Sequence, residues 1–141
     1  MSDEMQRKGA CLCGAVRITA TTENNSVGAC HCKMCRRWGG GPFMELTCTS
    51  DVAIDGKEHI TVFDSSAWAE RGFCNQCGTH LFYRLKKTGQ HMIPVGFFDD
   101  DDEVVFDHQV FIDEKPSFYR FANETRNMTG VELFARYGSS G

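Results

Sequence analysis

Seven of the eight cysteines fall into three short clusters whose spacing is typical of metal ligation. They are Cys11-x-Cys13, Cys30-x-Cys32-x-x-Cys35 and Cys74-x-x-Cys77. Thiolates this close in sequence repel one another unless a cation lies between them, and soft thiolate ligands favour zinc or an iron–sulfur centre. Two pairs make a closed four-sulfur site, whereas a triplet alone leaves one position vacant. The cluster sizes therefore predict two zinc ions per chain with different roles.

The two pairs predict a structural zinc site with four ligands, Cys11, Cys13, Cys74 and Cys77. A glycine follows each pair, at Gly14 and Gly78, and it allows backbone amides to point at the sulfurs without a Cβ clash. Four thiolates saturate a tetrahedral zinc ion, so this site should hold the fold together. The alternative is two buried cysteine pairs without metal.

The triplet Cys30, Cys32 and Cys35 predicts a second zinc site of the catalytic type, with water or substrate in the fourth position. The spare thiol, Cys48, alternates with apolar residues and is expected to be core packing. His31 lies between two ligands and is expected to point away. The alternative is a second structural site, completed by one of the histidines His59, His80 and His108.

An open three-thiolate zinc is a modest Lewis acid but a good host for a fourth soft ligand. A small-molecule thiol that binds there loses its proton. The natural electrophile for the resulting thiolate is a carbonyl carbon. The triplet thus indicates formation of a thiol–aldehyde adduct, or the reverse cleavage of a carbon–sulfur bond.

Several segments closely resemble the glutathione-dependent formaldehyde-activating enzyme family, whose domain is shared with a centromere-associated protein. They are Cys11-Leu12-Cys13-Gly14-Ala15-Val16-Arg17, Cys30-His31-Cys32-Lys33-Met34-Cys35-Arg36-Arg37, Gly40-Gly41-Pro42-Phe43, residues 71–83, residues 95–99 and residues 108–112. The resemblance covers roughly residues 9 to 120. It implies a mainly β, Mss4-like zinc-containing fold with short helical turns. It also implies the same division of the cysteines, a carbon–sulfur lyase activity, and glutathione and formaldehyde as substrates.

Other residues near the clusters have both a functional and a structural interpretation. Arg36, Arg37 and Arg71 suit the carboxylates of a thiol such as glutathione, but they equally suit a surface or the balancing of zinc–thiolate charge. His31 and His80 are candidate proton shuttles, although structural roles are favoured. Trp38 is a candidate cover for the three-cysteine site, but a core position is favoured. The acidic run at 99–103 lacks the pattern of a calcium loop and predicts a solvated turn.

The elements that must position these residues are mostly short strands bounded by turn residues. We expect strands at 15–20, 43–48, 60–63, 79–85, 91–97 and 109–112. One or two helical turns follow Cys32 through Trp38 and stop at three glycines and a proline. Residues 127–134 fit either type of structure.

Length and composition predict one zinc domain at residues 9–137, with loose ends at 1–8 and 138–141. The net charge of −4 argues against a nucleic-acid partner, and no apolar run has transmembrane length. The polar N-terminus and the clustered cysteines favour a cytoplasmic location. The sequence does not specify an oligomeric state.

Three functions compete at this point. The favoured one is a zinc-dependent carbon–sulfur lyase that acts on a small thiol and an aldehyde. The second is a non-catalytic zinc module that binds a protein partner, and the third is a cysteine-based redox or metal-buffering protein.

Overall fold

The computed structural model describes residues 4–137, which fold mainly as β-sheet, as the sequence predicted. The strands are β1 (Met5–Ala10), β2 (Arg17–Thr22), β3 (Ser26–Cys30), β4 (Phe43–Asp55), β5 (Ile60–Phe63), β6 (Ala69–Cys74), β7 (His80–Leu85), β8 (His91–Pro94), β9 (Val105–Val110) and β10 (Arg126–Met128). The helices are α1 (Lys33–Gly39) and α2 (Gly130–Tyr137), with 3-10 turns at Lys57–His59, Val95–Phe97 and Ile112–Glu114.

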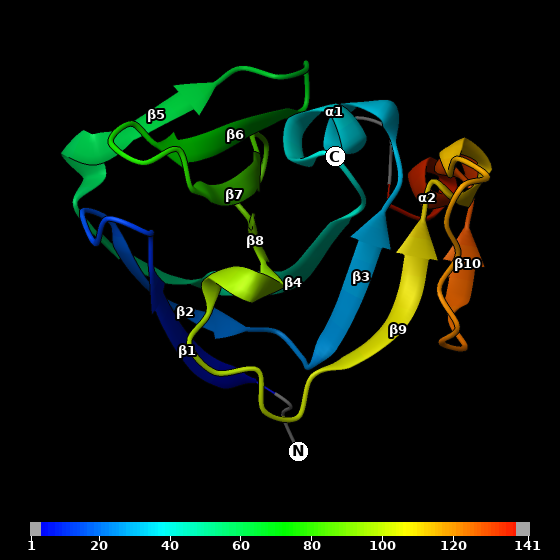
Figure 1. Ribbon diagram of the computed structural model, residues 1–141, viewed down its shortest axis with the longest axis horizontal. Coiled ribbons are helices and arrows are strands. Elements are labelled where there is room, and N and C mark those ends of the chain that lie inside the picture. The colour runs from blue at the N-terminus through cyan, green and yellow to red at the C-terminus, as the bar shows by residue number, and fades with distance from the viewer. Residues whose placement is uncertain (1–3, 138–141) are drawn as a thin grey trace.

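Eight strands form a strongly curved sheet in the order β10-β9-β3-β4-β8-β7-β6-β5 (Figure 1). Its pairs are antiparallel except for the two made by β9, which runs parallel to β3 and β10. The long strand β4 connects two parts of the molecule. Its first half pairs with β3 and β8, and its second half pairs with β2, which in turn pairs with β1.

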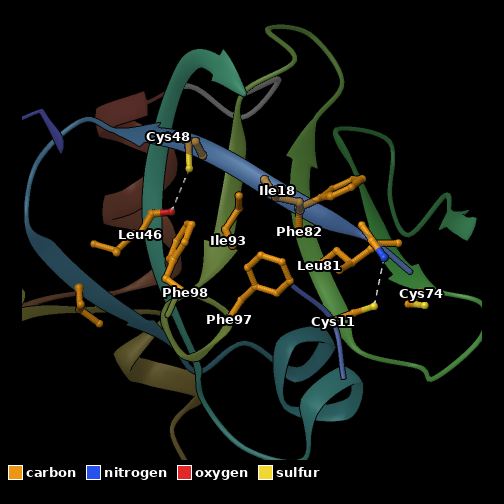
Figure 2. Close-up of a cluster of buried hydrophobic side chains, with 13 residues drawn as sticks. Cys11, Ile18, Leu46, Cys48, Cys74, Leu81, Phe82, Ile93, Phe97 and Phe98 are labelled. Atoms are coloured by element: carbon orange, nitrogen blue, oxygen red, sulfur yellow. Dashed lines mark hydrogen bonds between the residues drawn. The ribbon is translucent and has the colours of Figure 1, made fainter. Parts of the chain in front are cut away.

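The hydrophobic core takes side chains from β2, β4, β7, β8 and the turn at 95–97, and ten of them are labelled in Figure 2. Leu46 and Cys48 are both fully buried because alternate residues of β4 face this core. Cys48 lies at one end of the core, whereas Cys11 and Cys74 lie together at the other (Figure 2). The predicted packing role of Cys48 is confirmed, and burial raises the pKa of its thiol to about 12.

The opposite face of the sheet carries the side chains that matter for the second cysteine cluster. Strand pairing sets Cys30 beside Phe43, and Arg71 beside Tyr83. Helix α1 connects β3 to β4 and lies near β6 (Figure 1). The triplet is therefore placed where the end of β3, the start of α1 and the middle of β6 meet.

Two sequence expectations about regular structure need correction. Residues 5–8, expected to be loose, belong to β1, because the buried Arg7 side chain donates to the carbonyls of Asp100 and Asp102 and to Asn25 Oδ1. Strands β3 and β6 were not anticipated. The predicted loose tail at 138–141 lies outside the described residues.

The remaining elements follow the predictions with shifted bounds. The stretch 91–97 divides into β8 and a 3-10 turn, and the ambiguous tail contains both β10 and α2. The acidic run at 99–103 is exposed, as predicted for a solvated turn. Among residues 4–137, no helix is long and apolar enough to cross a membrane.

Candidate metal centres and the adjoining cavities

The structure brings the two cysteine pairs together into one four-sulfur cluster. The Sγ atoms of Cys11, Cys13, Cys74 and Cys77 all lie within 4.8 Å of one another. Cys13 Sγ is 3.6 Å from Cys11 Sγ and 3.7 Å from Cys74 Sγ. Zinc–sulfur bonds of about 2.3 Å give a tetrahedron whose sulfur–sulfur edges are about 3.8 Å. The cluster therefore has the size that a tetrahedral zinc ion requires.

Tight turns after each pair aim backbone N–H groups at these sulfurs. Val16 N donates to Cys11 Sγ at 3.3 Å, and Gln76 N donates to Cys74 Sγ at 3.4 Å. The turns pass through Gly14 and Gly78 at φ of +78° and +80°, where a residue with a Cβ would be strained. These amides stabilise thiolates, and the hydroxyl of Thr79, 3.2 Å from Cys77 Sγ, helps to lower the pKa of that thiol to about 5.

The triplet also converges, at the junction of β3 and α1. The Sγ atoms of Cys30, Cys32 and Cys35 lie within 4.8 Å of one another, and Cys32 Sγ caps the helix by accepting from Cys35 N at 3.3 Å. Proton sharing with Cys30 lowers the pKa of Cys32, while the same contact raises the pKa of Cys30. Three sulfurs so close cannot all be charged without a cation. The donor set thus fits a soft metal ion, and all eight cysteines are free of disulfides.

Within residues 4–137, no fourth His, Cys, Asp or Glu joins the triplet. His108 contacts Asp107 and His59 lies near Glu58, while His80 stacks on Trp38 with ring centroids 4.1 Å apart. None of the three histidines considered as a fourth ligand therefore joins the three sulfurs.

His31 lies in the triplet's loop but has a structural environment. Its side chain is fully buried, with Nδ1 2.7 Å from Tyr119 Oη and Nε2 2.7 Å from Gln109 Oε1. Gln109 donates its amide to Thr125, so its carbonyl oxygen accepts from His31 Nε2–H and Nδ1 accepts from the tyrosine hydroxyl. Burial lowers the pKa of His31. The buried ring has a hydrogen-bond partner on each nitrogen, which is the environment expected of a structural histidine.

Arg71 is the cation nearest to the triplet. Its guanidinium nitrogens lie 3.8 and 3.9 Å from Cys35 Sγ, and its side chain is buried. The guanidinium carbon lies 4.9 Å from the ring centres of both Trp38 and Tyr83. Trp38 is thus part of the wall around the triplet rather than of the central core.

Two cavities adjoin this region. The larger, of about 410 Å³, is lined by residues that include Cys35, Trp38, Phe43, Thr79 and His80. It therefore reaches the triplet at Cys35.

The smaller cavity has a volume of about 290 Å³ and a basic lining of Lys33, Arg36 and Arg37, with Phe118 and Tyr119 opposite. Arg36 is held there because its Nε donates to the His31 carbonyl at 2.8 Å.

Tyr83, Tyr119 and Gln109 contribute to the site, although no motif singles them out. Tyr83 and Gln109 lie within segments quoted for the family resemblance, residues 71–83 and 108–112, and this was the signal available for them. Tyr119 and Gln109 reach His31 from 88 and 78 residues away, a separation that a single sequence does not encode.

The chain is similar in sequence and in fold to several known proteins. The chain is 37% identical over 127 residues to a Schizosaccharomyces pombe protein named an uncharacterized lyase, covering 89% of this chain and 93% of that protein. Proteins of Podospora anserina and Talaromyces marneffei, provisionally named glutathione-dependent formaldehyde-activating enzymes, are 33% and 30% identical over 82 residues. Each match covers 55% of this chain but only 38% and 44% of those longer proteins.

A crystal structure of a Rhodobacter sphaeroides protein superposes with a TM-score of 0.57 at 27% identity, covering 65% of this chain and 87% of the other. The sequence profile of the glutathione-dependent formaldehyde-activating enzyme family matches residues 6–114, which include all seven clustered cysteines. On this match, and on the near full-length similarity to the S. pombe protein, the chain belongs to the glutathione-dependent formaldehyde-activating enzyme family.

Proposed function

We propose that the chain is a zinc-dependent carbon–sulfur lyase that forms or cleaves the adduct of a small thiol and a small aldehyde. In this proposal Cys11, Cys13, Cys74 and Cys77 hold a structural zinc, and Cys30, Cys32 and Cys35 hold a second zinc with an exchangeable position. The observation that carries the proposal is the second cluster, where three sulfurs converge beside a cavity with no fourth ligand among residues 4–137.

The reaction needs only a thiol and a carbonyl. Cys30, Cys32 and Cys35 would hold the zinc ion, which would offer a position for a fourth soft ligand and remove the proton of a thiol bound there. The substrate sulfur then attacks the carbonyl carbon, a carbon–sulfur bond forms, and the carbonyl π pair moves to oxygen. That oxygen takes up one proton, which balances the proton lost by the thiol. Cleavage runs through the same steps in reverse.

His80 is the residue best placed to carry that proton. It lines the larger cavity together with Cys35 and is fixed by stacking on Trp38. Burial, aided by the positive charge of Arg71, lowers the pKa of His80, so the ring is neutral at physiological pH and can accept a proton.

The basic cavity suggests what kind of thiol binds. Lys33, Arg36 and Arg37 form no ion pair with a carboxylate in the described part of the chain. Guanidinium groups in a concave lining favour carboxylates. A thiol that carries carboxylates, such as glutathione, fits this lining, and the names of the fungal relatives point to the same substrate.

The test is calorimetric titration of the zinc-loaded chain with glutathione and with S-methylglutathione, in two buffers of different ionisation enthalpy. We expect glutathione to bind with release of about one proton, because only a free thiol can lose its proton at zinc. S-methylglutathione should bind more weakly and release none. Glutathione binding without proton release, or with equal release in Cys32→Ser, would sink the proposal.

Two further measurements test the recognition of the substrate carboxylates and the turnover separately. Cysteamine lacks carboxylates, so Arg37→Gln should weaken glutathione binding but not cysteamine binding, whereas Lys87→Gln, on an exposed turn, should change neither. Turnover is measured by NMR exchange between free glutathione and its formaldehyde adduct. An exchange rate no faster than in buffer would leave a binding protein and refute the enzyme.

One observation favours the alternative of a non-catalytic zinc module. Leu12 is 90% exposed on the turn between Cys11 and Cys13, and Phe63 is 62% exposed on the edge strand β5. An exposed apolar residue beside a metal turn is a possible protein contact. The cavity that reaches Cys35 is the reason for ranking the enzyme first.

A further inference from the structure

The inference concerns Arg71, a cation buried beside the candidate catalytic centre. The residue is only 4% exposed, and its guanidinium carbon lies over the rings of both Trp38 and Tyr83. Tyr83 is itself fixed, because its hydroxyl accepts from Trp68 Nε1 at 3.1 Å. Burying a guanidinium is costly unless a negative group compensates for the lost hydration.

No carboxylate supplies that compensation within residues 4–137, since none of the ion pairs there involves Arg71. The aromatic rings contribute a favourable quadrupole but no charge. The polar partner that the side chain does have is Cys35 Sγ, which two guanidinium nitrogens approach at 3.8 and 3.9 Å. The position of the arginine is therefore explained only if the sulfur cluster is negative.

Formal charges support this explanation. Three thiolates and one zinc ion carry one net negative charge, which a single guanidinium cancels. We propose that Arg71 is the counter-cation and positioning residue of the three-cysteine centre: it neutralises the metal–thiolate complex and fixes the direction of the Cys35 sulfur. The inference depends on the proposed function only in requiring that the triplet holds a metal ion.

The four-cysteine cluster is arranged differently, which makes it an internal control. Cys13 is exposed to water, and the Cys11 and Cys74 sulfurs accept from backbone amides. Water and fixed amides screen that charge. At the triplet, one amide, Cys35 N, reaches Cys32 Sγ, and the buried Cys35 sulfur has the Arg71 guanidinium beside it. Cancelling the charge of the triplet also favours the binding of a substrate thiolate. With Arg71 present, the metal–thiolate complex would go from a net charge of zero to −1 on binding, whereas without Arg71 it would go from −1 to −2.

Lysine should replace arginine only in part. A lysine ammonium keeps the positive charge, but it lacks the planar group that lies between two rings and presents two nitrogens to one sulfur. Arg84 offers a matched control. It lies on the neighbouring strand β7 and over the Phe82 ring, but it pairs with Glu70 and has no contact with the triplet.

The experiment measures zinc release to a colorimetric chelator from the zinc-loaded wild type, Arg71→Gln, Arg71→Lys and Arg84→Gln. Two phases are expected, the faster from the triplet. Loss of groups that support metal ligands typically costs about 10–100-fold in metal affinity. Arg71→Gln should accelerate the fast phase within that range, Arg71→Lys should accelerate it less, and the slow phase should not change. Arg84→Gln should release zinc like the wild type.

Equal acceleration of both phases in Arg71→Gln, or no acceleration in a folded variant, would overturn the inference. If Arg71→Gln fails to fold, cobalt-loaded wild type and Arg71→Lys are compared instead. The inference then requires a shift of the thiolate-to-cobalt charge-transfer band, and an unchanged band overturns it. Zinc release needs no substrate. If zinc release depends on Arg71 but the chain binds no thiol, the proposed function is refuted and the inference about Arg71 stands.

Discussion

Exchanging one ligand of each centre for serine gives a sharp prediction about which centre holds the fold together. Cys74 is fully buried at one end of the core, and its sulfur lies 3.7 Å from Cys13 Sγ. A serine hydroxyl is a poor replacement for a thiolate at zinc. Structural zinc sites contribute about 10–16 kcal/mol in zinc-finger peptides, whereas whole domains are stable by about 5–15 kcal/mol. Losing half of the metal's contribution removes most of that stability, so Cys74→Ser should be unfolded or aggregated.

The same chemical change at Cys32 should be mild for the fold. Cys32 Sγ accepts from Cys35 N as the N-cap of α1, and serine is among the preferred N-cap residues. The helix start is therefore retained while one of three metal ligands is lost. We expect Cys32→Ser to change the free energy of unfolding by less than about 2 kcal/mol and to contain one zinc ion fewer than the wild type.

Urea unfolding followed by circular dichroism, together with elemental zinc analysis, measures both effects. Trace free zinc keeps metal rebinding from contributing to the measured stability. The reasoning is refuted if Cys32→Ser loses as much stability as Cys74→Ser. It is also refuted if Cys74→Ser remains folded with the zinc content of the wild type.

Three further predictions concern the core and the half-buried carboxyl group of Glu45. Burial raises the pKa of Glu45 to about 7. The folded chain therefore binds this proton more tightly than the unfolded chain, so the group lowers stability as pH rises from the ordinary glutamate pKa of about 4.3 to about 7. In urea titrations, Glu45→Gln should gain nothing near pH 4 and about 1–3 kcal/mol above about pH 8 relative to the wild type, and a constant difference would contradict this. Cys48→Ala should cost about 1 kcal/mol by thermal unfolding with unchanged zinc content, and a lost zinc ion would make Cys48 a ligand. Gly72→Ala should cost about 1–3 kcal/mol by the same measurement, because its Cβ would lie 2.4 Å from Phe82 Cζ; a neutral result would mean that the ring moves freely.

The cysteine clusters were predictable because metal ligation imposes short-range spacing. Spacing alone indicated that the Cys11 and Cys74 pairs form one cluster. The structure brings them together, although Cys13 and Cys74 are 61 positions apart in the sequence. The end of α1 was equally predictable, since three glycines and a proline follow Trp38 and cannot continue a helix. What these features share is a local chemical cause.

The missed elements depend on distant partners. Strand β6 carries a buried Arg71 and a glycine at position 72, and neither residue type is typical of a half-buried strand. Both are explained by the neighbouring strand, where Tyr83 packs against Arg71 and Phe82 packs against Gly72. Strand β1 reads as a polar tail because Arg7 is compensated by carbonyls 93 and 95 residues away. Hydrophobic patterns do not predict buried arginines, because the groups that compensate for their burial lie far away in the sequence.

The most direct test of the account is a crystal structure of the zinc-loaded chain with anomalous data at the zinc edge, before and after soaking with glutathione. The account predicts two zinc peaks per chain. One should have the sulfurs of Cys11, Cys13, Cys74 and Cys77 as its four ligands. The other should have those of Cys30, Cys32 and Cys35, with a fourth position where glutathione sulfur replaces solvent. A second zinc ion bound by four protein ligands, or no metal at the triplet, would contradict it.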